Sequence, residues 1–331
     1  MKKNYFLLAA STMMFAACAQ TDLVNEVVTE EAPQAIGFET FAEKVTRGEI
    51  NQTSDLESVD EGQFTVWGWK TQTDNTVTPI FEGQEVNWDA TKGWTYSPIK
   101  YWDKTATYEF YAVAPKKGAA TYELNNKKFI IEDVASGAAN STTYYLITRN
   151  AHSHSGASGG TVNFTFSHIM SKITIKVQQG TLANNKVVTL TDLNVSGWNK
   201  NTGTFTQDKT TQKEVNGVLK DVVCEWDLND DISEIGQYDF LKSGSEDVST
   251  KKKIGESYLM VPQENVDLKF TISYMIGTET FLAHEATIQD QTWEPNTHYI
   301  YTITVGPDEI LFDVDDIASW TDDSNGSTTI E

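Results

Sequence analysis

The stretch Thr161–Val177, near the middle of the chain, constrains the fold more than any other part of the sequence. Apolar residues occupy every second position from Val162 to Phe166, which is the period of a strand with one buried face. From Ile173 to Val177 they alternate again, but on odd instead of even numbers. One continuous strand would therefore turn its apolar face to water halfway along. We predict a break at His168–Ser171, where one β-domain passes the chain to a second.

Short aromatic and β-branched runs, separated by turn residues, fill most of the remaining sequence. They include FTVWGWK at Phe64–Lys70 and YEFYAVAP at Tyr108–Pro115. In the second half, Leu268–Ile276 alternates in the same way, and Pro262 must end the preceding strand or lie at an edge. No amphipathic helix of ordinary length appears. The sequence therefore predicts an all-β protein of antiparallel sandwiches or barrels.

Segments without apolar alternation are predicted to be loops or turns. Residues 149–160, RNAHSHSGASGG, are rich in Gly, Ser and His and are predicted to form a flexible loop. Residues 242–256, KSGSEDVSTKKKIGE, are predicted to form an exposed loop. The pair Asn125 and Asn126 is predicted to turn a hairpin before the strand KFIIED.

Length and composition are those of a globular protein with room for two domains. The chain has 331 residues, of which 39% are hydrophobic and 22% are charged. Its 47 acidic and 25 basic residues give a formal net charge of -22. Such a charge repels phosphate backbones and anionic lipid head groups. We therefore expect no nucleic acid partner.

The N-terminus has the features of an export signal. Lys2 and Lys3 precede an apolar run, and two small residues stand before Cys18. Residues 1–17 are therefore predicted to be a signal peptide. The sequence MFAAC at Met14–Cys18 looks like a lipobox, whose Cys receives lipid, and a lipid on Cys18 would tether the precursor to a membrane surface. The alternative is ordinary cleavage with an incidental Cys18.

Cysteine usage fits an anchored precursor. The sequence has 2 cysteines, so if Cys18 is acylated, Cys224 has no partner for an internal disulfide. No His or basic residue stands near Cys224 to activate its thiol. We therefore predict that Cys224 is a small buried apolar residue rather than a nucleophile.

The segment 18–47 is predicted to be a propeptide. It is first acidic and poor in structural signals, and it becomes strand-like at AIGFETF, Ala35–Phe41. Arg47 followed by Gly48 is a plausible cleavage point for an Arg-specific protease. The alternative is that Arg47 is an ordinary exposed arginine.

Residues with catalytic or metal-binding chemistry do not form a motif. His152 and His154 could share one side of an extended chain, but a metal site needs three or four rigid ligands, and no third one lies close in sequence. His168, His284 and His298 lie at the predicted domain junction or within strand-like runs. We therefore predict no enzyme activity, no cofactor and no metal site.

The dense aromatic residues from Trp67 to Tyr111 leave a second function open. Such rings could form a stacking platform for sugars, as on a monomeric glycan-binding surface lipoprotein. Alternating aromatic residues are more often the core of a sandwich.

Segments spread over nearly the whole chain together resemble the fimbrillin family, the pilin lipoproteins of Bacteroidetes. They are FTFSHIMSKITIKV at Phe164–Val177, VTRGE at Val45–Glu49, FTVWGWK at Phe64–Lys70, WTYSPIKYWDKTATYEFYAVAP at Trp94–Pro115, and the closing WEPNTHYIYTITV with ILFDVDDIASW. The resemblance implies two transthyretin-like antiparallel β-sandwich domains in tandem. Here they would be residues 48–166 and residues 167–331, after the lipidated propeptide 18–47. It also implies a structural pilin subunit of a cell-surface fimbria that supports adhesion.

In the resembled family, the precursor is an outer-membrane lipoprotein, an Arg-specific protease cuts it, and the tail of another subunit replaces its N-terminal strand. Carried over to this chain, the cut falls between Arg47 and Gly48. The implied partners are other pilin subunits, the protease and the outer membrane through the lipid, and a host or bacterial surface ligand is left open. The leaving strand would carry Ile36, Phe38 and Phe41, and the donor tail would carry Ile310, Phe312, Val314, Ile317 and Trp320.

Overall fold

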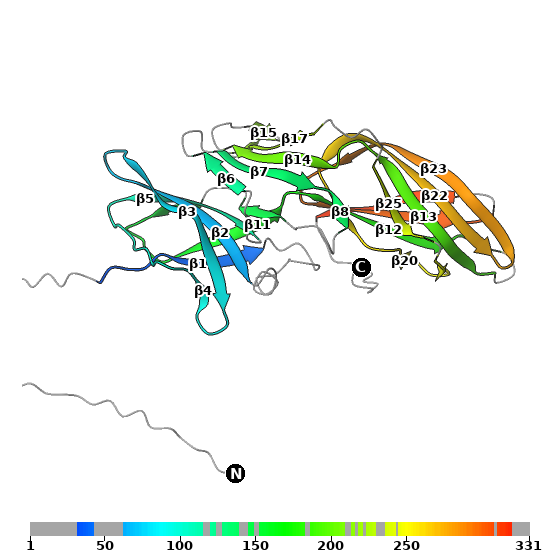
Figure 1. The fold of residues 1–331 in the computed structure, drawn as a ribbon, viewed down its shortest axis with the longest axis horizontal. Coiled ribbons are helices and arrows are strands. Elements are labelled where there is room, and N and C mark those ends of the chain that lie inside the picture. Colours follow the sequence, from blue (N-terminus) through cyan, green and yellow to red (C-terminus); the bar gives the residue numbers. More distant parts are fainter. Residues whose placement is uncertain are drawn as a thin grey trace, which may run out of the picture. The chain divides into compact units, whose positions relative to one another are not determined.

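The structure is a computed structural model, and it describes residues 32–42, 62–114, 120–123, 128–138, 145–148, 152–182, 186–208, 213–215, 218–220, 223–229, 236–242, 244–307 and 310–319. Every regular element in these residues is a β-strand (Figure 1), which confirms the predicted all-β class. The described part of the chain holds no helix, and so none that is long and apolar enough to cross a membrane.

The largest sheet has eight strands and contains most of the first half of the chain. Along this sheet the order is β1 (Gly37–Ala42), β11 (Thr161–His168), β9 (Leu146–Thr148), β5 (Thr107–Ala114), β2 (Gln63–Thr71), β3 (Val77–Asp89) and β4 (Gly93–Thr95), with β10 (His152–Ser155) paired to β5. All of its pairings are antiparallel except that of β1 with β11.

Two further sheets contain most of the second half. The first runs β25 (Ile310–Ser319), β24 (Thr297–Val305), β12 (Ser171–Gln179), β21 (Tyr258–Met260) and β8 (Gly137–Ala138), with β20 (Lys252–Lys253) on β12. The second runs β18 (Gly236–Leu241), β13 (Val188–Trp198), β22 (Gln263–Ile276) and β23 (Glu279–Trp293), with β19 (Glu246–Asp247) on β13. Side chains from both sheets make one core, so these sheets pack face to face.

Strands from both halves of the chain also pair with each other. A four-stranded sheet runs β17 (Val223–Leu228), β14 (Thr202–Asp208), β7 (Lys128–Ala135) and β6 (Ala120–Glu123), and β15 (Lys213–Val215) pairs with β16 (Val218–Lys220). In the first of these sheets β7 pairs with β14, and elsewhere β8 pairs with β21. The division into residues 48–166 and 167–331 stays a prediction, and hydrogen-bonded ladders cross it.

The predicted break in strand phase is confirmed. β11 ends at His168 and β12 begins at Ser171. The alternating apolar residues on both sides of the break are buried: Phe164, Phe166, Ile173, Ile175 and Val177. Two strands with separate inward faces therefore replace the single strand that the phase change forbids.

The turn between β23 and β24 holds this break in place. The backbone N–H of Asn296 donates to the carbonyl of Met170 over 3.0 Å. The side-chain oxygen of Asn296 accepts from the backbone N–H of His168 over 3.1 Å, and the Ser171 hydroxyl donates to the carbonyl of Glu294 over 2.7 Å. Asn296 has a left-handed backbone, with φ of 57°, which Asn adopts more easily than most residues.

Three apolar clusters fill the described part of the fold. The cluster beneath β1 is mostly aromatic and includes Phe38, Phe64, Phe110 and Phe164. A second lies on the other face of β2 and β5 and reaches β7, β14 and β21. The third lies between the two C-terminal sheets and contains the alternating residues of β22: Leu268, Phe270, Ile272, Tyr274 and Ile276. That alternation is confirmed.

The predicted loops are wrong in part. β10 lies within 149–160 and pairs with β5, while β19 and β20 lie within 242–256. Val248 and Ile254 of the second segment are buried. Short polar strands of this kind are held by the neighbouring sheet and carry no apolar period of their own. β6 and β7 form the predicted hairpin, but Asn125 and Asn126 lie outside the described residues.

Candidate functional site

Strand β1, in the predicted propeptide, is an edge strand of the largest sheet. It runs parallel to β11, with six paired positions from Gly37 opposite Thr161 to Ala42 opposite Phe166. Figure 1 shows the two arrows side by side, β1 in blue and β11 in green. Sequence reasoning predicted the strand, but neither its partner nor its direction.

The residues just before β1 are held on their other side by the segment that follows β4. Ile36 donates its N–H to the carbonyl of Lys100 over 2.9 Å, and Gln34 accepts at its carbonyl from the N–H of Trp102 over 2.9 Å. Ala35 and Tyr101 form an antiparallel bridge between these bonds. The start of the propeptide strand is therefore also bound on its second side. We call the segment that binds it, residues 96–102, the clasp.

Tyr96 connects the clasp to the strand. Its hydroxyl donates to the carbonyl of Ile36 over 2.8 Å and accepts from the N–H of Lys100 over 3.2 Å. Burial raises the pKa of Tyr96, so the hydroxyl remains protonated and can donate at any ordinary pH. No local sequence pattern indicates this role of Tyr96, because it depends on residues 60 positions apart.

Three side chains of this strand point into the core. Ile36, Phe38 and Thr40 are 2%, 3% and 0% exposed, whereas Glu39 is exposed. Thr40 therefore fills the third inward position, which the apolar prediction did not include. The side chain of Phe41 lies outside the described residues. Strand alternation places the register position of Phe41 on the face opposite to that of Phe38.

The ring of Phe38 lies in an aromatic pocket. It stacks on Phe164 with ring centroids 5.5 Å apart and an interplanar angle of 18°. Four other rings lie around it with centroids between 5.4 and 6.4 Å away: Phe64, Phe81, Tyr96 and Phe110. Aromatic pairs in these geometries contribute about 0.5 to 1.5 kcal/mol beyond their buried area. Phe38 thus contacts five aromatic rings.

Gly68 of β2 makes room for this pocket. A Cβ atom at Gly68 would lie 2.7 Å from Cδ1 of Phe110 and 3.1 Å from Cδ2 of Phe81. Both rings contact Phe38. The glycine of the FTVWGWK segment therefore lets two rings approach the sheet closely enough to line the pocket.

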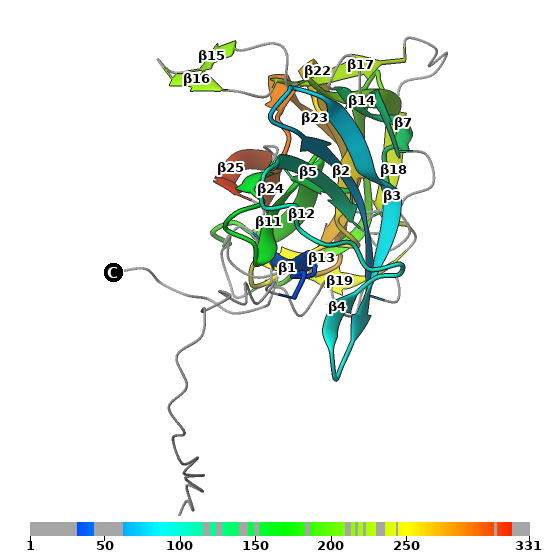
Figure 2. The same ribbon diagram turned by 90° about the vertical axis from the view of Figure 1, so that its left-hand side faces the viewer.

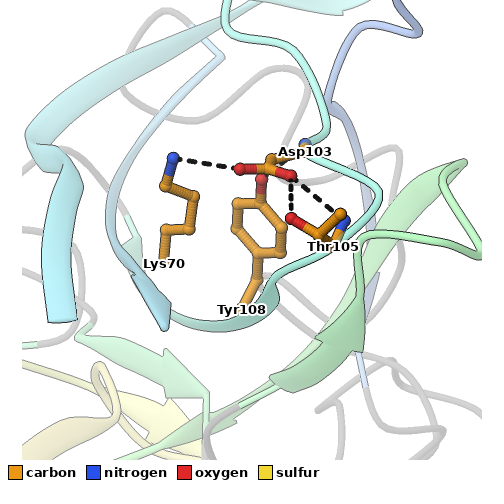
Figure 3. A network of polar contacts seen from close by, with 4 residues as sticks. All are labelled: Lys70, Asp103, Thr105 and Tyr108. Carbon is orange, nitrogen blue, oxygen red and sulfur yellow. Dashed lines mark hydrogen bonds and ion pairs between the residues drawn. The ribbon is translucent and has the colours of Figure 1, made fainter. Parts of the chain in front are cut away.

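A polar network fixes the end of the clasp (Figure 3). The Lys70 ammonium lies 3.3 Å from Oδ2 of Asp103, and Thr105 donates to Oδ1 of Asp103 from its hydroxyl over 2.7 Å and its N–H over 3.0 Å. The N–H of Asp103 donates to the hydroxyl of Tyr108 over 2.7 Å. The bonds from Thr105, reinforced by Lys70, hold the pKa of the Asp103 carboxyl below its ordinary value. Because Asp103 follows Trp102, the network anchors the residue that binds Gln34.

The predicted donor tail forms strand β25 in its own C-terminal sheet. β25 pairs antiparallel with β24, where Ile310 is opposite Val305, Phe312 opposite Ile303, Val314 opposite Tyr301, and Ile317 opposite Tyr299. Figure 2 shows the two strands side by side. The β24 partners are all buried, and a register shift next to Ile300 keeps Ile317 in line with them. The four predicted tail positions are therefore in register with buried residues of β24, and the side chains of Phe312, Val314 and Ile317 lie outside the described residues.

The remaining predicted residues fall where no side chain is described. Cys18, Arg47, Gly48 and Trp320 lie outside the described residues, and so does the side chain of Cys224 in β17. In the sequence, Arg47 stands between the end of β1 at Ala42 and the start of β2 at Gln63. A cut at Arg47 would therefore separate β1 from the rest of the chain.

The aromatic residues between Trp67 and Tyr111 do not form a surface platform. All are buried except Trp88, which is half-buried, and Tyr101, which is 53% exposed. Among the described residues, no three His, Cys, Asp or Glu side chains gather as a metal site requires. His154 instead stacks on Trp102, with ring centroids 4.7 Å apart.

Comparison with known proteins identifies relatives of this chain. A family described as fimbrillin-like matches residues 46–320. A fimbrial protein from Bacteroides vulgatus shares 16% identity, with 85% of this chain and 98% of that chain covered and a TM-score of 0.53. A candidate cell adhesion protein from Bacteroides ovatus shares 14% identity, with 88% and 99% covered and a TM-score of 0.50. A search of curated proteins gives no match. At these identities the two structures are similar to this chain in fold.

Proposed function

The chain belongs to the fimbrillin-like family, and we propose that it is a structural subunit of a cell-surface fimbria that supports adhesion. In this proposal it is exported as a lipoprotein precursor, anchored in the outer membrane through Cys18, and cut after Arg47. The cut subunit then polymerises by strand exchange and leaves the membrane surface as part of the fimbria. The family is structural and not enzymatic.

The position of β1 is the observation that supports the proposal most directly. β1 completes the aromatic cluster, yet it precedes the predicted cut. Burying Ile36 and Phe38 contributes roughly 3 to 6 kcal/mol gross, at about 1.5 to 3 kcal/mol for each side chain. A subunit that lost β1 would expose the pocket of Phe38 to water. Another strand must then fill that place, as in strand addition at an open sheet.

Covalent connection explains why the precursor would stay monomeric. While the chain between β1 and β2 is intact, β1 is present at an effective concentration of roughly millimolar order next to its own binding place. A free tail from another molecule cannot compete at ordinary concentrations. Cutting after Arg47 removes this advantage, because β1 then depends on non-covalent contacts, which among the described residues are its six-position ladder, the clasp and its three inward side chains.

The proposal is tested by blocking the cut. The sequence contains two arginines, Arg47 and Arg149, so Arg149→Ala is a matched control for Arg47→Ala. With an Arg-specific protease, the wild type and Arg149→Ala should give a ladder of multimers on unheated gels and a new N-terminus at Gly48 by mass spectrometry. Arg47→Ala should remain a folded monomer in the membrane fraction. A normal ladder from Arg47→Ala would overturn the proposed processing.

The lipid is tested in the same background. In Arg47→Ala, a second change, Cys18→Ser, should move the protein from the membrane fraction to the soluble fraction, while Cys224→Ser should not. Membrane association that survives Cys18→Ser would contradict the proposed anchor.

A further inference from the structure

The place that β1 occupies sets three requirements for any strand that refills it. The first inward position holds the aliphatic Ile36, the second holds an aromatic ring at Phe38, and the third holds the small β-branched Thr40. The second position is enclosed by five rings, so an aliphatic residue there would leave a void. A strand that refills this place therefore needs an aliphatic, an aromatic and a small β-branched residue, in this order, at every second position.

We infer that the refilling segment is Ile310–Val314 of a second copy of this chain, in one defined register. Ile310 takes the position of Ile36, Phe312 that of Phe38, and Val314 that of Thr40. This inference rests on the proposed strand exchange and goes beyond it by naming the segment, its register and a homotypic partner.

The sequence match between the two strands supports this register. Residues 36–40 read IGFET and residues 310–314 read ILFDV. The first two inward residues are identical, and Val has the same branched shape as Thr. The aromatic residue is followed in both strands by an acidic one, Glu39 or Asp313, and Glu39 is exposed. Each inward side chain of the tail thus has a place already shaped for it.

The one unlike position is tolerated by the local geometry. Gly37 corresponds to Leu311. A Cβ atom at Gly37 would lie 3.3 Å from Oγ1 of Thr161, and the three atoms nearest to it all belong to the Thr161 side chain. Because these atoms belong to the end of an exposed side chain, a rotation of Thr161 makes room for the Cβ atom of a residue at this position.

No other part of the tail offers the pattern. After β24 the sequence has two aromatic residues, Phe312 and Trp320, and Trp320 has Ala318 and Asp322 at the flanking inward positions. Elsewhere, the similar runs Leu268–Ile272 and Ile272–Ile276 belong to β22, which is paired on one side to β13 and on the other to β23. A central strand cannot be given to another molecule without breaking two ladders.

β25 can leave its own sheet at smaller cost. Among the described strands it pairs with β24 alone, and Leu311 is 52% exposed. β24 would keep its eight paired positions with β12 after β25 has left. In the new place, the main chain of Ile310 would take over the two bonds of Ile36, donating to Lys100 and accepting from Tyr96.

A disulfide trap tests the register. Glu39 is paired with Asn163 on β11, so the inference places Asp313 of the second copy opposite Asn163. In a Cys224→Ser background, Asn163→Cys with Asp313→Cys should give a ladder that survives heating without reductant and collapses with it. Asn163→Cys with Leu311→Cys is the control, because two residues along the strand put those Cα atoms roughly 8 Å apart, beyond disulfide reach.

The outcomes separate this inference from the proposed function. A cross-link in the variant with Asn163→Cys and Asp313→Cys, and none in the Leu311 control, supports both the inference and the proposed function. Multimers that form without a cross-link, or with one only in the Leu311 control, overturn the register and leave strand exchange intact. Failure of the cut wild-type protein to form multimers overturns the proposed function and the inference with it.

A peptide experiment keeps the test independent of how the cysteine variants fold. A synthetic peptide of residues 308–318 added to cut wild-type subunits should raise their melting temperature and suppress the ladder. The same peptide with Phe312→Ala should lose at least tenfold in apparent affinity, and that with Leu311→Ala should lose less than threefold. Equal affinities for the three peptides would overturn the inference.

Discussion

Among the described strands, β1 and β25 are both edge strands, but their backbone ladders differ in length and direction. β1 has six residues, pairs in parallel with one strand, and inserts Phe38 among five rings. β25 has ten residues and pairs antiparallel with β24 over nine positions. Parallel pairing is slightly weaker per residue than antiparallel pairing. The short parallel ladder of β1 is therefore supplemented by its side chains and by its connection to β2, whereas β25 has a longer antiparallel ladder.

This difference explains how one cut could act on β1 alone. A proteolytic cut removes the connection and leaves the contacts unchanged. The covalent connection contributes most to the retention of a strand whose backbone ladder is short. It contributes little to the retention of a strand with a longer ladder. Three substitutions separate the contributions of side chain, clasp and network.

Phe38→Ala should have the largest effect. It empties the aromatic pocket of the uncut protein, and a Phe→Ala change in a core costs about 3 to 5 kcal/mol of unfolding free energy. Chemical denaturation of the Arg47→Ala precursor measures it. Glu39→Ala, on the exposed face of the same strand, should change the free energy by less than about 0.5 kcal/mol. Equal effects would show that side-chain burial does not hold β1.

Tyr96→Phe should have an intermediate effect. It removes the hydroxyl that donates to Ile36 while keeping the ring beside Phe38. A hydrogen bond of this kind contributes about 0.5 to 1.5 kcal/mol. The loss should appear as faster hydrogen exchange in β1 of the precursor. Tyr101→Phe is the control, because Tyr101 is exposed. If hydrogen exchange in β1 is unchanged in Tyr96→Phe, the clasp does not contribute to the retention of β1.

Asp103→Asn should have the smallest effect, and the effect should depend on pH. The folded pKa of Asp103 is lowered, so its carboxylate adds stability above the unfolded pKa of about 4 and loses it as the pH falls toward the lowered value. The melting temperatures of wild type and variant should therefore differ at pH 7 and converge below about pH 4. Glu39→Gln, which removes an exposed carboxylate outside this network, is the control variant. A difference that persists at low pH would mean that the carboxylate charge is not what fixes the clasp.

Strand periodicity predicted much of the fold, since alternation records which face meets a core. It located the break between β11 and β12, the inward face of β22 and the strand at 35–41. It failed where strands are short and polar, as in β10, because their pairing partners lie far away in sequence. Periodicity also did not identify Thr40, because the side chain of Thr40 points inward but is not apolar.

By itself, the sequence determined the all-β class, the phase of the long strands and the matching patterns of 36–40 and 310–314, because each depends on residues close together in the chain. The tertiary structure decided the parallel pairing of β1 with β11, the clasp at Tyr96 and Trp102, and the five rings around Phe38. These contacts join residues tens to more than a hundred positions apart. No local pattern encodes them, because they form only when several strands have packed together.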